Sequence, residues 1–311
     1  MDKAKHDIAQ ELMTQGFSVV PGFLSDKDVG KDLLAFLANA PKFADGVING
    51  IPDGKMSGIQ RKIETLIPEI AGIAGLAICR DRFNYCAIRI QEAHGPAVVR
   101  HPFDMHRDPK VAPGGVLNWH LDHFSYYLYR DHWNWLICYM PVVKPSPELT
   151  NLAIIPADVL ECLDPELSSH IRGRGAMRFR CVEPDTKEWF SMRFPGQNIK
   201  IGDWFAIDDF DDSTMGWKIG IDLERCKVVP HLEVYDLLIM RADVIHRTND
   251  AGSDRISIRC DGMPLHAREV DTLPGLLKLT ASLPFVGKKR RYNLRNWIRS
   301  EWRKRLHGSS C

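Results

Sequence analysis

The segment Asn118-Trp119-His120-Leu121-Asp122-His123-Phe124 is the most informative part of this chain. It sets an imidazole and a carboxylate two residues apart within an aromatic run. In a β-strand, side chains at positions i and i+2 point to the same face. His120 and Asp122 could therefore reach one metal ion, while Leu121 turns away into the packing. Because His-x-Asp also occurs by chance, the pair alone does not establish a metal site.

Two such ligands hold a metal weakly, so the interpretation requires a third. The best candidate is His246, in the segment from Asp236 to Asn249. Two imidazoles and one carboxylate on one side of a metal leave positions open opposite, which suits non-haem Fe(II). His101 and His106 are competing candidates. They are disfavoured because they fall in a Pro- and Gly-containing loop and neither has a carboxylate at strand spacing.

A possible carboxylate-binding fork follows the third ligand. The run from Gly252 to Arg259 alternates as a strand does, so Arg255 and Ser257 share a face. A guanidinium can donate two parallel charge-assisted hydrogen bonds to a carboxylate, and a neighbouring hydroxyl can add a third. Such a fork would hold the far end of a dicarboxylate whose other end chelates the metal.

The order His-x-Asp, distant His and Arg-x-Ser resembles the Fe(II)/2-oxoglutarate-dependent dioxygenases. The stretch from Gly16 to Val29 is similar to the opening of their phytanoyl-CoA dioxygenase-like branch. The resemblance implies a mainly β fold with flanking helices, a double-stranded β-helix of the jelly-roll, cupin-like kind. It also implies that His120, Asp122 and His246 are the catalytic metal ligands. The cofactors would be Fe(II) with 2-oxoglutarate and O2 as co-substrates, and Arg255 and Ser257 would bind 2-oxoglutarate.

The resemblance further implies an enzyme that converts 2-oxoglutarate to succinate and CO2 while oxidising a C–H bond. Hydroxylation is the default outcome, and desaturation, ring closure or epimerisation are alternatives that use the same ligands. The expected substrate is a small molecule or a carrier-bound group in specialised biosynthesis. One departure puts that substrate class in doubt, because Pro145 to Pro156 stands where the branch usually has Pro-Gly-Ser-His.

Composition sets the wider limits. The 311 residues carry a net charge of +1, so bulk charge indicates no nucleic-acid or membrane partner. Eight scattered cysteines without a Cys-x-x-Cys pair argue against a zinc ribbon or a disulfide framework. No run of about 18 apolar residues is present. We therefore expect a soluble, cytoplasmic protein.

Hydrophobic spacing predicts the other elements. Ser25 and Asp28 resemble a capping box that opens a helix continuing through Leu37. The other expected elements are helices over Ala4–Gln15 and Ile59–Leu76, a loop over Lys42–Gly58, and strands over Phe17–Val20, Tyr85–Gln91, Leu136–Val143 and Lys200–Ile207.

These elements predict one catalytic domain over residues 1–311. Residues 1–80 would form an N-terminal helical buttress, and residues 81–265 the jelly-roll core with an insertion at about 163–230. Residues 266–311 would form a basic C-terminal extension. Within the insertion, the acidic cluster from Asp208 to Asp212 is expected to be a solvated loop rather than a calcium site.

The C-terminal extension has a basic amphipathic pattern from Lys288 to Leu306. Its tryptophan face could dock on the domain or on a second subunit, and a homodimer could also form through the aromatic residues around Tyr126 to Trp135. Membrane or nucleic-acid binding by this helix is a weaker alternative. The remaining alternative for the whole chain is a non-catalytic jelly-roll binding protein that works through this helix.

Overall fold

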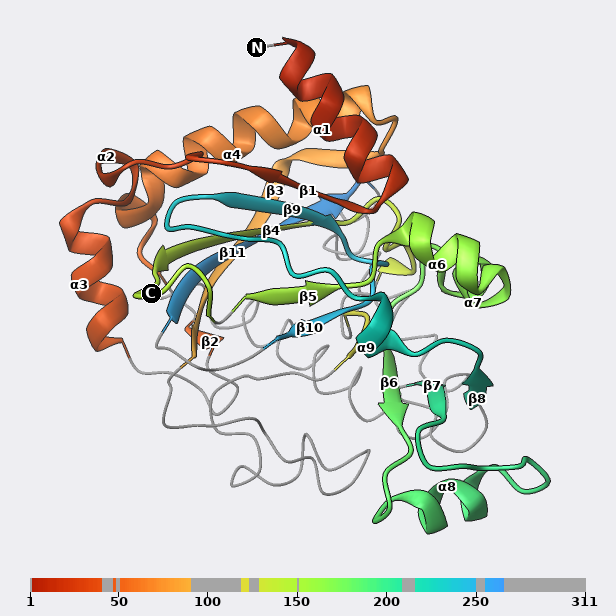
Figure 1. The fold of residues 1–311 in the computed structure, drawn as a ribbon. Coiled ribbons are helices and arrows are strands. Elements are labelled where there is room, and N and C mark those ends of the chain that lie inside the picture. Colours follow the sequence, from red (N-terminus) through yellow and green to blue (C-terminus); the bar gives the residue numbers. More distant parts are fainter. Residues whose placement is uncertain are drawn as a thin grey trace, which may run out of the picture.

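The computed structural model describes residues 2–40, 47–48, 51–90, 119–122, 129–149, 151–208, 216–249 and 255–265 (Figure 1). Its elements follow one another as α1 (Asp2–Thr14), β1 (Phe17–Val20), α2 (Asp26–Val29), α3 (Lys31–Asn39), β2 (Val47–Ile48), α4 (Asp53–Ile73), β3 (Ile78–Ile90), β4 (Leu136–Val143), β5 (Leu152–Ile154), α6 (Ala157–Leu163), α7 (Pro165–Ile171), β6 (Met177–Cys181), α8 (Lys187–Arg193), β7 (Trp204–Asp208), β8 (Gly216–Ile219), α9 (Leu223–Cys226), β9 (Leu237–Arg241), β10 (His246–Thr248) and β11 (Arg255–Pro264).

The predicted helix through Leu37 is in fact two helices. The capping interaction is present, since the backbone N–H and hydroxyl of Ser25 both donate to Asp28 Oδ2, at 2.8 and 2.7 Å. Gly30 then adopts a φ of +68° and ends α2 after a single turn. This left-handed conformation suits glycine, and α3 starts in a new direction directly after it.

The prediction of a loop up to Gly58 is wrong for residues 53–58, which form the first turns of α4. Met56 and Ile59 are buried and extend the apolar stripe of this helix toward its N-terminus. Gly58 is needed for a close contact between two helices and not for a turn, because a Cβ there would lie 2.6 Å from the carbonyl oxygen of Asp28. The helix can therefore pack directly on the α2 backbone.

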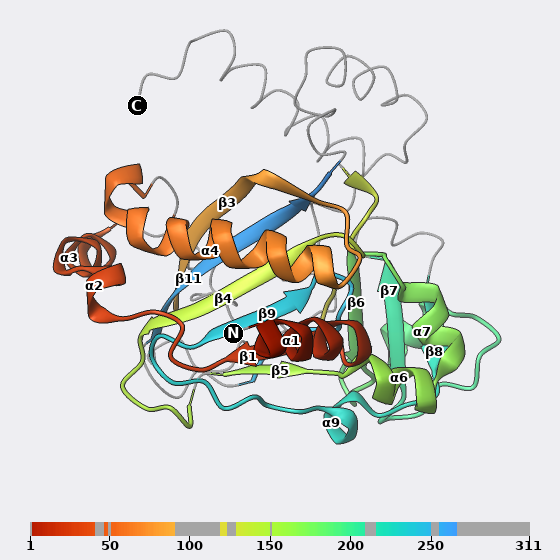
Figure 2. The ribbon, with the colours of Figure 1, turned by 90° about the horizontal axis from the view of Figure 1, so that it is seen from above.

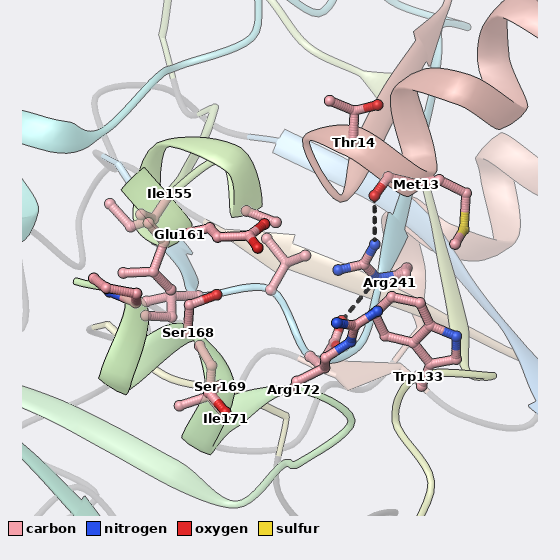
Figure 3. A pocket seen from close by; sticks show the side chains of 16 residues that line it. Met13, Thr14, Trp133, Ile155, Glu161, Ser168, Ser169, Ile171, Arg172 and Arg241 are labelled. Atoms are coloured by element: carbon pink, nitrogen blue, oxygen red, sulfur yellow. Dashed lines mark hydrogen bonds and ion pairs between the residues drawn. The ribbon is translucent and has the colours of Figure 1, made fainter. Parts of the chain in front are cut away.

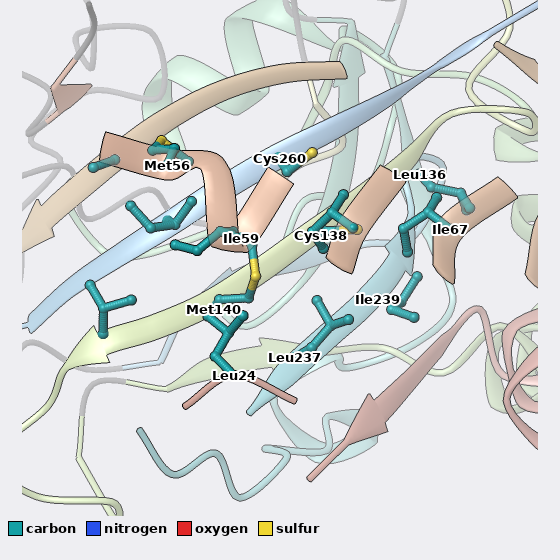
Figure 4. Close-up of a cluster of buried hydrophobic side chains, with 14 of the residues drawn as sticks. Leu24, Met56, Ile59, Ile67, Leu136, Cys138, Met140, Leu237, Ile239 and Cys260 are labelled. Carbon is teal, nitrogen blue, oxygen red and sulfur yellow. The ribbon is translucent and has the colours of Figure 1, made fainter. Parts of the chain in front are cut away.

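A six-stranded antiparallel sheet in the order β1-β9-β4-β11-β3-β2 forms the first layer. Helices α1 and α4 cover one face of it (Figure 2). Strand β11 alternates across this sheet. Ile256, Ile258 and Cys260 join the core under the helices, part of which is drawn in Figure 4. The polar residues of β11 therefore point to the opposite face, toward the second layer.

The second layer contains the pair β10-β5 and the three-stranded run β6-β7-β8. His120 joins the two groups, because its backbone makes antiparallel bridges to both Arg178 of β6 and His246 of β10. Helices α6 and α7 pack on the outer face of this layer. Between the layers lies a core that includes Ile137, Leu238 and Ile154. Two facing antiparallel sheets with flanking helices confirm the predicted jelly-roll fold class.

Residues 163–230, which were predicted as an insertion, hold α7, β6, α8, β7, β8 and α9. Strand β6 extends the second layer through its bridge to His120, so part of this region belongs to the barrel sheet. The strand predicted from Lys200 begins only at Trp204, after a turn in which Gly202 has a φ of +91°. The predicted domain boundaries themselves stay a prediction.

Several predictions lie outside the described residues. These are the loop carrying His101 and His106, the aromatic residues Tyr126 and Tyr127, the part of the acidic cluster after Asp208, and the basic helix from Lys288. In the part of the chain that the structure describes, no helix is long and apolar enough to cross a membrane.

Candidate metal centre

Backbone pairing brings the two predicted imidazole ligands together. The N–H of His120 donates to the carbonyl of His246 at 3.0 Å, and the N–H of His246 donates back at 3.1 Å. Directly paired residues of an antiparallel ladder carry their side chains on the same face. The two rings consequently lie with their centroids 4.3 Å apart. Sheet register, rather than a loop, sets this geometry.

Asp122 completes the cluster. The donor atoms of His120, Asp122 and His246 all lie within 4.8 Å of one another. The three residues are buried, at 4, 6 and 6% exposure. Nδ1 of His246 lies 2.9 Å from the carbonyl oxygen of Val244. If Nδ1 carries the proton, Nε2 is left with its lone pair for a metal, which is the usual arrangement for a metal-binding histidine.

The donor set fits the implied metal. Two imidazoles and one carboxylate, converging on one point, are the ligand types that non-haem Fe(II) takes in facial coordination. Burial alone would raise the pKa of Asp122. The guanidinium of Arg259 and the imidazoles of His246 and His120 instead hold that pKa well below its usual range. The carboxylate is therefore anionic at neutral pH, as a metal ligand must be.

The two residues of the predicted fork lie on the facing sheet. Arg255 and Ser257 lie on one face of β11, at 2 and 0% exposure. Ser257 Oγ donates to the Tyr139 hydroxyl at 2.6 Å, and the Arg255 guanidinium lies 5.1 Å from the Tyr139 ring centroid. Tyr139, on β4, thus belongs to the same polar cluster. Its role could not be read from the sequence, because it depends on how β4 pairs with β11.

A second pair missed by the sequence analysis lies further along the same face. Arg259 donates from Nη2 to Asp122 Oδ2 at 2.9 Å, and from Nε to Asp261 Oδ1 at 2.9 Å. The signal that could have found these residues is the two-residue period of Arg255 and Ser257, which continues through both. The polar face of β11 therefore reaches from the fork to the metal ligands.

His132 lies close to Asp122, and its titration is expected to make the free energy of unfolding depend on pH. It is fully buried, and burial lowers the pKa of its imidazole to about 4, although Asp122 acts in the opposite direction. Between pH 6.5 and 4 the unfolded chain therefore binds a proton that the folded protein does not. We expect the free energy of unfolding to fall as the pH drops through this window, by up to about 1.4 kcal/mol per pH unit from this group.

Urea denaturation at pH 7, 6 and 5 measures this slope, and His132→Gln provides the comparison. The ring of His132 would lie 2.2 Å from a Cβ at Gly175, so the substitution alters packing as well. The informative quantity is therefore the slope with pH and not the absolute stability. Equal slopes in the two proteins would contradict the prediction.

A separate cavity of about 290 Å3 lies between α1, α6, α7 and the turn from β9 to β10 (Figure 3). Trp133 lines it, with the guanidinium carbons of Arg172 and Arg241 at 4.4 and 4.2 Å from its ring. None of the predicted metal or co-substrate residues lines this cavity. It borders Val244 and Ile245, which directly precede His246, so it lies behind the metal centre.

Comparisons with known proteins found general similarity only. No family model matches the chain, and no curated protein matches its sequence. Among solved structures, the non-haem alpha-ketoglutarate-dependent epimerase SnoN from nogalamycin biosynthesis is 15% identical, with 85% of this chain and 84% of that chain covered and a TM-score of 0.45. EvdO2 from Micromonospora carbonacea var. aurantiaca is 11% identical, with 83 and 90% covered and a TM-score of 0.45. A prolyl-4-hydroxylase from Pseudomonas putida is 12% identical, with 84 and 91% covered and a TM-score of 0.42.

Proposed function

We propose that this protein is a non-haem Fe(II)/2-oxoglutarate-dependent oxygenase. The observation that carries the proposal is the buried convergence of His120, Asp122 and His246 within 4.8 Å. Burying two imidazoles and a carboxylate side by side costs desolvation free energy, and metal binding would offset that cost. The polar face of β11, with Arg255 and Ser257, would provide a binding site for an anionic co-substrate beside these three ligands.

Each residue has a distinct role in this proposal. His120, Asp122 and His246 would hold Fe(II), which supplies O2 activation coupled to oxidation of 2-oxoglutarate to succinate and CO2. The guanidinium of Arg255 would bind the distal carboxylate of 2-oxoglutarate, supported by the hydroxyls of Ser257 and Tyr139. Tyr139 remains a neutral donor near pH 7, because burial raises its pKa.

Hydroxylation of a small-molecule or carrier-bound substrate is the default outcome of this chemistry. Desaturation, ring closure or epimerisation would use the same residues and differ only in how the substrate is held. A cytoplasmic location also belongs to the proposal, supported by the seven described cysteines, none of which forms a disulfide with another described residue. A homodimer through the aromatic residues or the C-terminal helix stays a prediction; of the segments expected to form it, only Tyr129 to Trp135 lies within the described residues.

The co-substrate site provides the first test. We expect Arg255→Ala to weaken 2-oxoglutarate binding about 10- to 100-fold, the loss typical of a charge-assisted hydrogen-bond pair. The measurement is an anaerobic titration of the Fe(II)-loaded protein with 2-oxoglutarate, followed by the weak visible charge-transfer band of the chelate. Arg255→Lys keeps the charge but not the fork, so it should recover only part of the affinity.

Arg247→Ala is the matched control, because Arg247 pairs with Glu224 on the other side of the second layer. Its titration should match that of the wild-type protein. A wild-type protein that binds Fe(II) but shows no chelate band would overturn the proposed function. The non-catalytic binding protein would then be the better interpretation.

A further inference from the structure

Asp122 has two oxygen atoms, and the structure gives them different surroundings. Oδ1 lies 4.0 Å from Nε2 of His120, one of the other two proposed ligands. Oδ2 accepts a hydrogen bond of 2.9 Å from Nη2 of Arg259, whereas Nη1 of Arg259 is 3.5 Å from Oδ1. The short contact from Arg259 therefore belongs to Oδ2, whereas Oδ1, the oxygen paired with Nε2 of His120, has only the longer one.

Arg259 is itself held in place. Its Nε donates to Asp261 Oδ1 at 2.9 Å, and the two residues share the polar face of β11. A guanidinium is planar, so fixing Nε on one carboxylate also fixes the direction in which Nη2 points.

The backbone of Asp122 is fixed independently of its side chain. The N–H of Ala176 donates to the carbonyl of Asp122 at 2.6 Å, and the N–H of Leu121 donates to the carbonyl of Met177. These bonds place the Cα of Asp122 but leave rotation of its carboxylate about the side-chain bonds open. Arg259 is the described side chain that hydrogen-bonds to this carboxylate.

We propose that Arg259, oriented by Asp261, is a positioning residue that occupies Oδ2 of Asp122 and so restricts the carboxylate to a metal bond through Oδ1 alone. This inference rests on the proposed function. A carboxylate that chelated the metal through both oxygens would take up one more coordination position. Single-oxygen binding keeps three positions for the co-substrate and O2, so the ion pair protects the open side of the centre.

Coordination of Co(II) tests the proposal without turnover. A chelating carboxylate brings its carbon closer to the metal than a single-oxygen carboxylate does, and X-ray absorption fine structure of the Co(II)-loaded protein detects that difference. We expect single-oxygen binding in the wild type and chelation in Arg259→Gln. Arg259→Lys, which can still donate to Oδ2, should restore the wild-type pattern. Succinate formation in Arg259→Gln should fall about 10- to 100-fold, the usual effect of losing such a partner.

Arg247→Gln is the matched control and should leave the Co(II) signal unchanged. Should Arg259→Gln fail to fold, Asp261→Asn provides the second variant, since it keeps Arg259 but removes its anchor and should give a mixture of the two binding modes. Single-oxygen binding in both variants would overturn the inference. A wild-type protein that binds no Co(II) would instead overturn the proposed function, so the two failures are distinguishable.

Discussion

Replacing Asp122 with alanine is expected to abolish the 2-oxoglutarate chelate band and to lower succinate formation by more than about 100-fold. Loss of a residue that only supports a metal ligand typically costs about 10- to 100-fold, so loss of a ligand should cost more. The substitution also leaves the partly buried guanidinium of Arg259 without its Oδ2 partner. Fe(II) titration and succinate detection measure the two effects separately.

Asp158→Ala is the control for this experiment, since Asp158 is exposed on α6 and distant from the triad in the chain. It should retain both the band and the turnover. Asp122→Asn refines the comparison, because it keeps the size of the side chain while removing the charge. An Asp122→Ala protein that folds and retains the chelate band would show that this carboxylate is not a metal ligand.

Replacing Asp243 with alanine is expected to lower the free energy of unfolding by about 3–5 kcal/mol, the cost of leaving one partner of a buried ion pair uncompensated. Asp243 Oδ1 accepts from Arg241 Nε at 3.0 Å, and both side chains are at most 5% exposed. Its other oxygen accepts from the N–H of Gly173 at 2.8 Å. Urea denaturation measures the loss.

The matched control is Asp203→Ala. Asp203 pairs with Lys218 at 2.7 Å, but the lysine side chain is 39% exposed, so this pair should contribute less than about 1 kcal/mol. Similar losses in the two variants would contradict the prediction. Both variants remove one carboxylate from a salt bridge. A difference between their losses in free energy of unfolding therefore reports the effect of burial and not of the ion pair itself.

Features that depend on neighbouring residues in the chain could be predicted from the sequence. The strand over Leu136–Val143 and the capping pair Ser25 and Asp28 are present where the local pattern placed them. The predicted ligands His120, Asp122 and His246 also lie together, although their binding of a metal stays a prediction. The spacing of His120 and Asp122 is the two-residue period of a strand, and the spacing of Ser25 and Asp28 is the three-residue separation of a capping box.

Features that depend on pairing between distant strands could not be predicted. Tyr139 is placed beside the fork by the register of β4 against β11, in which it stands opposite Arg259. Gly58 resembled a loop residue, because its close contact with the Asp28 carbonyl depends on how α4 packs on α2. For Tyr139 and Gly58, the sequence shows the residue type, but the group that each residue contacts is set by the tertiary structure.

His120 forms the seam of the second layer, because a bridge on each side of this residue joins β6 to β10. A metal bound to His120 and His246 would fasten the same seam that their backbone hydrogen bonds close. Metal binding and the pairing of β6 with β10 through His120 would then stabilise each other, so that removal of the metal would weaken the sheet first at this residue. In the proposed oxygenase, differences in substrate preference would therefore arise in segments away from His120, which can change without separating β6 from β10.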